Sequence, residues 1–195
     1  MRALPWALVG CVSCALVACT GTAGRPSLPR LLADAPDDVP ARLLLAGDQV
    51  AAAAVPLGPG SLPAAVRTTF EAIAPGGTTT FVGREWSERG DGYRLEKSYV
   101  DGLVTKSRSV LAAADGRVLE RWHSVPLRDV PQQVLATALR TGPAIDEARI
   151  VSGPAREEYW SLLVRDRGGR TFVVLVGLDG APKAQLRRLR AQLDS

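Results

Sequence analysis

The sequence predicts an α+β fold made of two tandem helix-plus-antiparallel-sheet units, with a further helix at the C-terminus. Three observations support this prediction. Proline and Asp-Gly motifs recur at a nearly constant offset, apolar residues in two segments follow helical spacing, and Asp-Gly pairs separate runs of strand-forming residues. The recurrence divides the folded part into a first unit at residues 61–123 and a second unit at residues 124–195.

The recurrence is clearest in two short motifs. Val55-Pro56-Leu57 returns as Val125-Pro126-Leu127, and Asp115-Gly116 returns as Asp179-Gly180. The offset shrinks from 70 residues at the first motif to 64 at the second, as expected if loops were shortened after a duplication. Chance alignment of proline and Asp-Gly motifs is the alternative explanation.

Each unit is predicted to begin with a helix. In the first unit, Pro63 suits the first helical turn, and Val66, Phe70 and Ile73 follow at spacings that place them on one helical face. Pro75-Gly76-Gly77 ends this helix. The second helix is predicted at about residues 131–140, where Gly142-Pro143 ends it.

Strands are predicted after each helix. Asp101-Gly102 indicates a tight hairpin turn, because this pair accepts the positive φ that such turns require. Tyr93, Leu95 and Tyr99 alternate onto one face of the strand before it. The predicted strands are residues 78–86, 93–100, 103–114 and 118–122 in the first unit, and 145–152, 157–166 and 170–178 in the second.

The closing helix is predicted at about residues 183–193. Leu186, Leu189 and Leu193 fall on one helical face, away from the arginines between them. Such a helix either packs its leucines on the sheet or lies on an anionic membrane surface. The arginines that form this possible interaction surface are Arg187, Arg188 and Arg190.

The tryptophans are a second candidate for an interaction surface. Trp86, Trp122 and Trp160 are the tryptophans outside the N-terminal signal. An exposed aromatic cluster typically marks a binding surface. The alternative is burial between helix and sheet, which suits a chain with so few other aromatic residues.

Residues 1–18 have the layout of a secretory signal peptide, with Arg2 before an apolar stretch and small residues at the end. The segment Leu16-Val17-Ala18-Cys19 resembles a bacterial lipobox, in which cleavage precedes the cysteine and its thiol is diacylated. The resemblance implies lipidation of Cys19 and a membrane-anchored protein in the cell envelope. In a host with two membranes, it implies an outer-membrane location facing the periplasm. The alternatives are an ordinary signal peptide cut near Ala23 and an uncleaved membrane anchor.

Residues 19–60 are predicted to be the lipidated cysteine followed by a tether rich in proline and alanine. The prolines prevent any long regular element. Within this segment, residues 41–55 are apolar enough to contact the folded body, but Arg42 and Asp48 exclude a membrane span. A short helix or turn followed by an extended piece is the prediction for residues 41–55.

Cysteine usage and charge narrow the class of protein. All three cysteines lie at or before Cys19, so the body carries no disulfide framework and no thiolate metal site. Loss of the signal with Arg2 lowers the formal net charge from +4 to +3, which is too small to indicate a nucleic-acid partner.

The sequence offers little for catalysis. His123 is the single histidine, so a zinc site would lack a second imidazole, and no Gly-x-Ser-x-Gly motif presents a nucleophile. No glycine-rich phosphate loop is present, and Glu157-Glu158 are sequence neighbours rather than a spaced catalytic pair. We therefore expect no catalytic residue, no metal and no cofactor.

The repeated unit resembles the PepSY and PepSY-like (β-lactamase-inhibitor-protein-like) family. The resemblance rests on the helix before Pro75-Gly76, the strand around Tyr93, Asp101-Gly102, and the stretch Val110–Leu119, with Tyr159 and Asp179-Gly180 in the second copy. It implies an exported, non-catalytic protein that binds or inhibits another envelope or secreted protein through its sheet faces. The alternatives are a structural lipoprotein that supports assembly of an outer-membrane complex and a hydrolase that relies on carboxylates.

Overall fold

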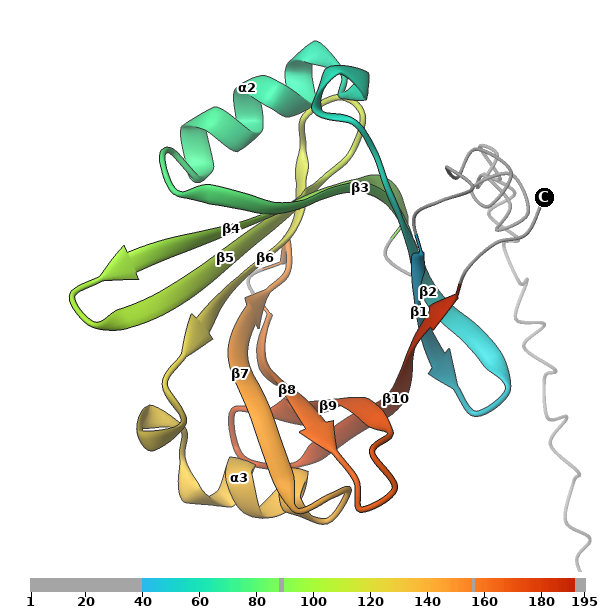
Figure 1. Ribbon diagram of the computed structural model, residues 1–195, viewed down its shortest axis with the longest axis vertical. Coiled ribbons are helices and arrows are strands. Elements are labelled where there is room, and N and C mark those ends of the chain that lie inside the picture. Colours follow the sequence, from blue (N-terminus) through green and yellow to red (C-terminus); the bar gives the residue numbers. More distant parts are fainter. Residues whose placement is uncertain (1–39, 88–89, 156, 192–195) are drawn as a thin grey trace, which may run out of the picture.

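The protein folds as one closed antiparallel β-barrel, seen as a ring of strands in Figure 1. The computed structural model describes residues 40–87, 90–155 and 157–191. The predicted α+β fold of two helix-plus-sheet units is therefore wrong, because all the strands belong to a single sheet and the two α-helices are short. The strands are β1 (Ala41–Ala46), β2 (Gln49–Pro56), β3 (Thr78–Ser87), β4 (Gly90–Asp101), β5 (Val104–Ala112), β6 (Val118–Val125), β7 (Ala144–Ser152), β8 (Glu158–Arg165), β9 (Thr171–Gly177) and β10 (Pro182–Ala191).

Each strand pairs with the next along the chain, and the pairing of β1 with β10 closes the ring. The hairpin β1–β2 supplies this closure, because β2 pairs with β3 on its other side. The segment 41–55, expected as a short helix or turn and an extended piece, therefore forms two strands. Gly47, with φ of 61°, makes the turn between them, in a conformation that glycine adopts without steric cost.

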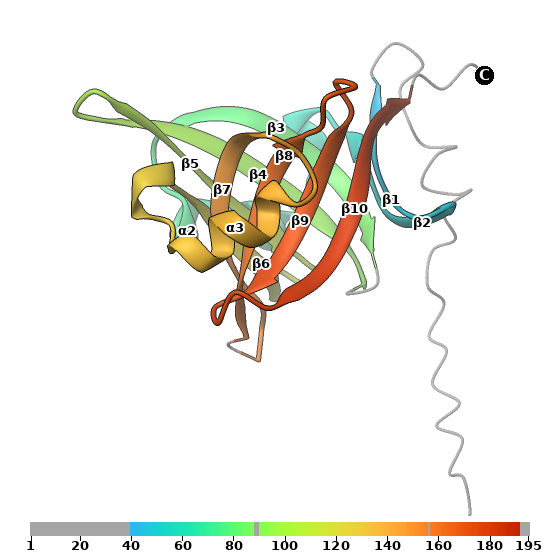
Figure 2. The ribbon, with the colours of Figure 1, turned by 90° about the horizontal axis from the view of Figure 1, so that it is seen from below.

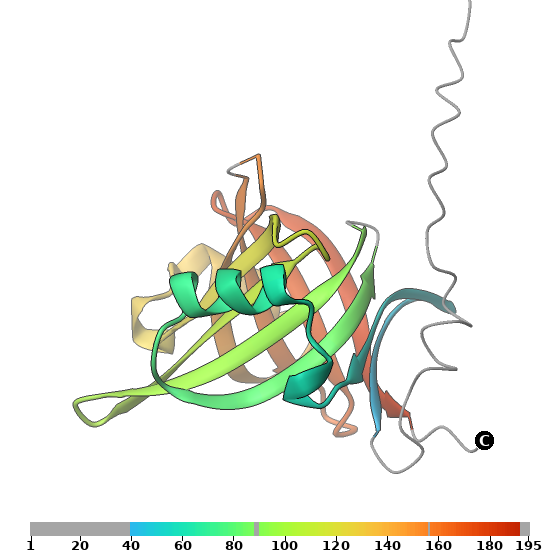
Figure 3. The ribbon, with the colours of Figure 1, turned by 90° about the horizontal axis from the view of Figure 1, so that it is seen from above.

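Two helices lie on the outside of the barrel (Figure 1): α2 (Ala64–Ile73) and α3 (Gln132–Leu139). Both were predicted from the sequence, and a 3-10 turn precedes each (Pro59–Ser61 and Leu127–Asp129). Seen from above, α2 crosses the outer face of the barrel (Figure 3). Within the described residues, neither helix is long and apolar enough to cross a membrane.

The hydrophobic cores lie between these helices and the outer face of the sheet. Val66 and Phe70 of α2 pack on Leu95 and Val110. The core under α3 is larger, and its buried members are Val130, Val134, Ala138, Ala148, Trp160, Leu162, Val164, Val174 and Val176. The apolar faces of β4 and β5 therefore point outward to α2, and their other faces line the barrel interior.

Equivalent hydrogen bonds attach each helix to the sheet. The Thr69 hydroxyl of α2 donates to the carbonyl of Gly116 at 2.8 Å, and the Thr137 hydroxyl of α3 donates to the carbonyl of Gly180 at 2.8 Å. Both glycines belong to the Asp-Gly turns that recur in the sequence. The tandem organisation itself stays a prediction.

The predicted C-terminal helix at residues 183–193 is wrong, because residues 182–191 form strand β10. Successive side chains of a strand point to opposite faces of the sheet. Arg188 and Arg190 therefore share one face, and Arg187 and Leu189 lie on the other. Arg188 lies opposite Leu44 and Arg190 opposite Arg42 in the register with β1. Pairing with β9 and β1 on both edges outweighs the helical spacing of the leucines.

Close approach of α2 to the turn at Gly116 yields a stability prediction. Gly116 has φ of 86°, and an added Cβ would lie 2.9 Å from both the Ala65 carbonyl oxygen and the Thr69 hydroxyl. We expect Gly116→Ala to lower the free energy of unfolding by about 2–4 kcal/mol, from backbone strain and overpacking together.

The matched control is Gly169→Ala. Gly169 has a similar φ of 76°, but no atom lies within 4 Å of its added Cβ. We expect this variant to lose about 1–2 kcal/mol of unfolding free energy, measured by urea unfolding, because only the backbone strain of a positive φ applies to it. Equal losses in the two variants would show that the contact between α2 and the turn adds nothing.

Candidate functional site

The interior of the barrel is lined by charged side chains, in contrast to an ordinary apolar core. Alternation along each strand turns one set of residues inward, and the registers bring these residues together across the ring. Burying a charged side chain costs free energy unless an opposite charge pairs with it. The interior charged residues are Arg42, Arg94, Arg149 and Arg188, with Glu85, Glu96, Glu120 and Glu147.

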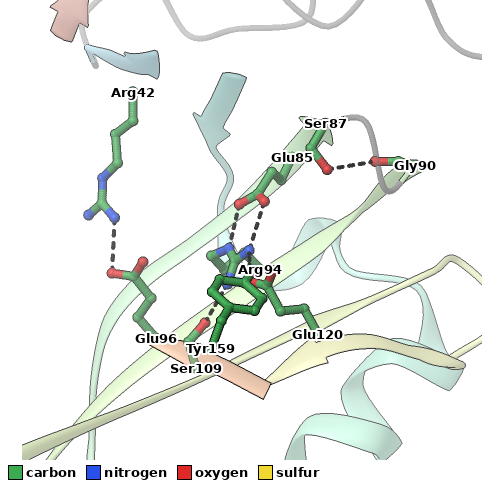
Figure 4. A network of polar contacts seen from close by, with 9 residues as sticks. All are labelled: Arg42, Glu85, Ser87, Gly90, Arg94, Glu96, Ser109, Glu120 and Tyr159. Atoms are coloured by element: carbon green, nitrogen blue, oxygen red, sulfur yellow. Dashed lines mark hydrogen bonds and ion pairs between the residues drawn. The ribbon is translucent and has the colours of Figure 1, made fainter. Parts of the chain in front are cut away.

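Arg94 lies at the centre of a buried network of polar contacts in the interior (Figure 4), and only 7% of its surface is exposed. From β4, its guanidinium donates to both carboxylate oxygens of Glu85 on β3 and, at 2.9 Å, to Glu120 on β6. It also donates to the Ser109 hydroxyl at 3.0 Å, and the Tyr159 hydroxyl donates to Glu120 at 3.4 Å. One arginine of β4 therefore connects the neighbouring strands β3, β5 and β6.

Burial alone would lower the pKa of Arg94, but attraction to Glu85 and Glu120 holds that pKa well above its ordinary value. The guanidinium of Arg94 thereby fixes the positions of both carboxylates.

Two further ion pairs stand beside aromatic rings. Arg42 of β1 donates to Glu96 at 2.9 Å, as Figure 4 shows, and its guanidinium lies 3.8 Å from the centre of the Phe81 ring. Arg149 of β7 donates to Glu147 at 2.7 Å and lies 3.8 Å from the centre of the Trp122 ring. Each ring face stabilises the cation above it and limits its rotation.

Arg188 of β10 differs from these three arginines. Among the described residues, no acidic side chain forms an ion pair with it. Burial lowers the pKa of Arg188, and repulsion from Arg42 and Arg149 lowers it further. Glu96 acts in the opposite direction but does not cancel these effects, so positive charge is concentrated around Arg188.

A cavity of about 140 Å³ lies between these groups. Arg42, Arg149 and Arg188 border it. Its apolar wall consists of Leu44, Ala52, Ala54, Phe81, Leu163 and Val173. A second hollow at the barrel rim, of about 460 Å³, shares Leu163 and Arg188 with this cavity, so Arg188 stands between the interior and the rim.

A separate feature is the tip of the β4–β5 hairpin, which extends beyond the rest of the barrel in Figures 2 and 3. The pairing of β3 with β4 begins at Thr78 opposite Ser98, and β6 pairs with β5 only as far as His123 opposite Arg108. The tip beyond these positions therefore has no neighbouring strand on either side. Val100 is 81% exposed and Leu103 is fully exposed.

The residues proposed from the sequence do not gather in one place. Trp122 faces the interior, Trp160 is buried beneath α3, and Trp86 packs on the outer side of the closing hairpin. Arg188 lines the cavity, while Arg187 faces the other way. Exposed His123 lies on the outer face of β6, opposite Arg108.

Cys19 and the lipobox residues Leu16, Val17 and Ala18 lie outside the described residues, so lipidation stays a prediction. The interior network was missed by sequence reasoning. Its signal was present: Glu85, Arg94 and Glu96 alternate with aromatic and aliphatic neighbours such as Tyr93 and Leu95. The charged face looked like the solvated one, because no local pattern shows that a sheet will close on itself.

Comparison with known proteins gives only distant similarity. No protein-family model matches the chain, and no curated protein matches it. A protein of Bacteroides eggerthii described as periplasmic aligns with a TM-score of 0.49 and 15% identity, over 66% of this chain and 90% of its own. A BLIP-like protein of Bacteroides fragilis aligns with a TM-score of 0.42 and 15% identity, over 69% of this chain and 89% of its own. Similarity at this level does not carry a function to this chain, and the tandem PepSY-like units stay a prediction.

Proposed function

We propose that this protein is a non-catalytic, lipid-anchored binding module of the cell envelope, which contacts another envelope or secreted protein through the tip of its β4–β5 hairpin. The observation that supports this proposal is the exposure of Val100, Leu103 and Val104 on a hairpin that no other strand covers. Adjacent exposed apolar side chains on a projecting element are typical of protein contacts.

The tip is suited to binding for two reasons. Beyond Ser107, whose backbone N–H donates to the Ser124 hydroxyl at 2.7 Å, neither edge of the tip pairs with another strand within the described residues, and an extended segment of a partner can pair with such an edge. Its turn is also fixed, because Lys106 donates to Asp101 across it and Gly102 adopts φ of 62°. A rigid tip loses little conformational entropy on binding.

The sequence had suggested contact through the sheet faces. The inner face lines a closed interior that a protein partner does not enter, and helices cover much of the outer face. The hairpin tip replaces the sheet faces as the proposed contact.

The interior carboxylates support a non-catalytic function. Glu85, Glu120, Glu96 and Glu147 each accept hydrogen bonds from an arginine, which fixes them in structural ion pairs. A structural lipoprotein that supports an outer-membrane complex is the alternative function. The two are distinguished by whether the captured partner is a secreted enzyme or a component of a membrane complex.

The partner can be captured by placing a photo-crosslinking amino acid at position 103 in cells that produce the full chain. A matched control carries it at Leu178, a leucine that is also exposed, at 49%, but belongs to the turn between β9 and β10. We expect position 103 to give one adduct of defined mass that position 178 does not give. The same adducts from both positions, or none from position 103, would rule out the tip as the contact.

Once the partner is known, the contribution of the tip can be measured. We expect Leu103→Asp to weaken binding by about 30-fold or more, since truncation of a central apolar contact typically costs 2 kcal/mol or more. Leu178→Asp should bind as the parent does in the same titration. Both variants should unfold at the parental urea concentration, which separates a lost contact from a damaged fold.

A further inference from the structure

We propose that the barrel interior binds a small organic anion, a carboxylate with a compact apolar body, whose negative group lies on Arg188 between Arg42 and Arg149. This site is independent of the hairpin tip. It would give the protein a ligand in addition to its protein partner.

The charge distribution favours an anion at this position. Arg42 and Arg149 each have one glutamate, whereas Arg188 has none within the part of the chain that the structure describes. The surplus charge at this end is therefore positive, and Arg190, on the same side of β10, adds to it at the rim. A carboxylate would supply the missing counter-charge and could accept hydrogen bonds from two guanidinium groups.

The arginines are already oriented for such a ligand. Phe81 lies under Arg42 and Trp122 under Arg149, each at 3.8 Å from ring centre to guanidinium. Because these cations are stacked and ion-paired before binding, little side-chain entropy remains to be lost. Arg188 alone is free of a protein partner among the described side chains, so its donors are available.

The cavity decides between an organic and an inorganic anion. Its volume of about 140 Å³ is close to that of engineered cavities of about 150 Å³ that bind benzene. Besides the arginines, Trp122, Glu85 and Ser161, the cavity is lined by Leu44, Ala52, Ala54, Phe81, Leu163 and Val173, whose side chains offer no hydrogen bond. Inorganic phosphate would leave this wall unused, whereas a benzene-sized body would cover it.

The rim hollow shares Leu163 and Arg188 with the cavity, so Arg188 is common to both. Its charged lining residues are Arg170, Arg187, Arg188, Arg190 and Asp146, of which Arg170 is paired with Asp166. Arginines therefore outnumber acids at the rim, and a positive entrance speeds association with anions.

Benzoate is the probe, titrated calorimetrically into the detergent-solubilised full chain in Tris chloride without other organic acids. Benzamide has the same shape without the charge, and inorganic phosphate has charge without an apolar body. We expect saturable 1:1 binding of benzoate, at least tenfold weaker binding of benzamide, and weaker binding of phosphate. No saturable binding of benzoate, or phosphate binding as tightly as benzoate, would overturn the proposal.

Arg188→Met removes the charge and keeps the side-chain length, and we expect it to weaken benzoate binding about 10- to 100-fold, the range for loss of a charged hydrogen bond. Arg188→Lys, which keeps the charge but not the fork, should bind with intermediate affinity. Arg121→Met is the control, because it removes an exposed arginine on the outer face of β6 that borders neither the cavity nor the rim hollow, and it should bind as the parent does.

A stability measurement separates ligand binding from a structural role. Without ligand, Arg188→Met should unfold at the parental urea concentration or above it, because it removes an unpaired, partly buried cation. Added benzoate should raise the Tm of the parent but not of this variant. A less stable Arg188→Met, or an equal loss of benzoate binding in Arg121→Met, would overturn the assignment of Arg188 as the anion-binding residue.

Discussion

Replacement of Arg94 by methionine is expected to lower the free energy of unfolding by about 3–5 kcal/mol, which is the range for removing one partner of a buried ion pair while the other stays buried. Arg94 is 7% exposed and holds two glutamates. Without it, Glu85 and Glu120 would both lose the guanidinium that pairs with them in the interior. The measurement is urea unfolding followed by tryptophan fluorescence.

A compensating variant tests the physical reason. The triple variant adds Glu85→Leu and Glu120→Leu to Arg94→Met, which removes the two carboxylates that Arg94 had paired. Apolar replacements of a whole buried ion-pair set are often neutral or stabilising, so we expect most of the lost stability to return. If the triple variant is as unstable as Arg94→Met, the loss comes from packing around the arginine side chain and not from unpaired charge.

Cys19→Ala is expected to move the protein from the membrane fraction to the soluble fraction entirely. A thiol is required at this position for diacylation, which the lipobox resemblance implies for Cys19. A single acyl chain gives marginal membrane binding, whereas two or more hold a protein stably, so loss of all of them removes the anchor. Fractionation of cells and the intact mass of the purified chain provide the measurement.

Two results would contradict lipidation. The first is an unchanged membrane fraction for Cys19→Ala, and the second is a parental mass that shows no added acyl groups. A control substitution at Cys14 removes a thiol within the signal and should leave both fractionation and mass as they are in the parent.

Local sequence signals were sufficient for α2, α3 and most turns, but they wrongly predicted a helix at residues 183–193. The spacing of Val66 and Phe70 identified α2, and Pro131 preceded α3 as a helix start. Asp101-Gly102 and Asp115-Gly116 are turns, with both glycines at positive φ, as their sequence predicted. These features depend on residues close together in the chain, which a pattern can capture.

The closure of the barrel could not be predicted in this way, since it depends on residues far apart in the sequence. The alanine-rich β2 has low intrinsic strand preference, and its pairing partners on both sides determine its conformation. Strand β10 carries leucines at helical spacing, yet alternation of Leu186, Arg188 and Arg190 also fits a strand. The choice between these periods depends on β1 and β9.

The candidate sites could likewise be predicted only as far as they depend on residues close together in the sequence. Exposure of Leu103 could be anticipated beside a predicted turn, although the length of the uncovered tip depends on where β3 and β6 stop. The interior site was hidden because its arginines come from β1, β7 and β10. Only the register places Arg42, Arg149 and Arg188 around one cavity.

The pairing of β1 with β10 has a consequence for the export that the signal-like residues 1–18 predict. A chain that crosses a membrane amino end first presents its first strand long before its last, so the ring could not close until nearly the whole polypeptide had crossed. During that delay one edge of β1 exposes unpaired backbone N–H and C=O groups, which can pair with another chain and promote aggregation. Escort by a chaperone on the far side of the membrane should therefore matter more for this molecule than its modest size suggests.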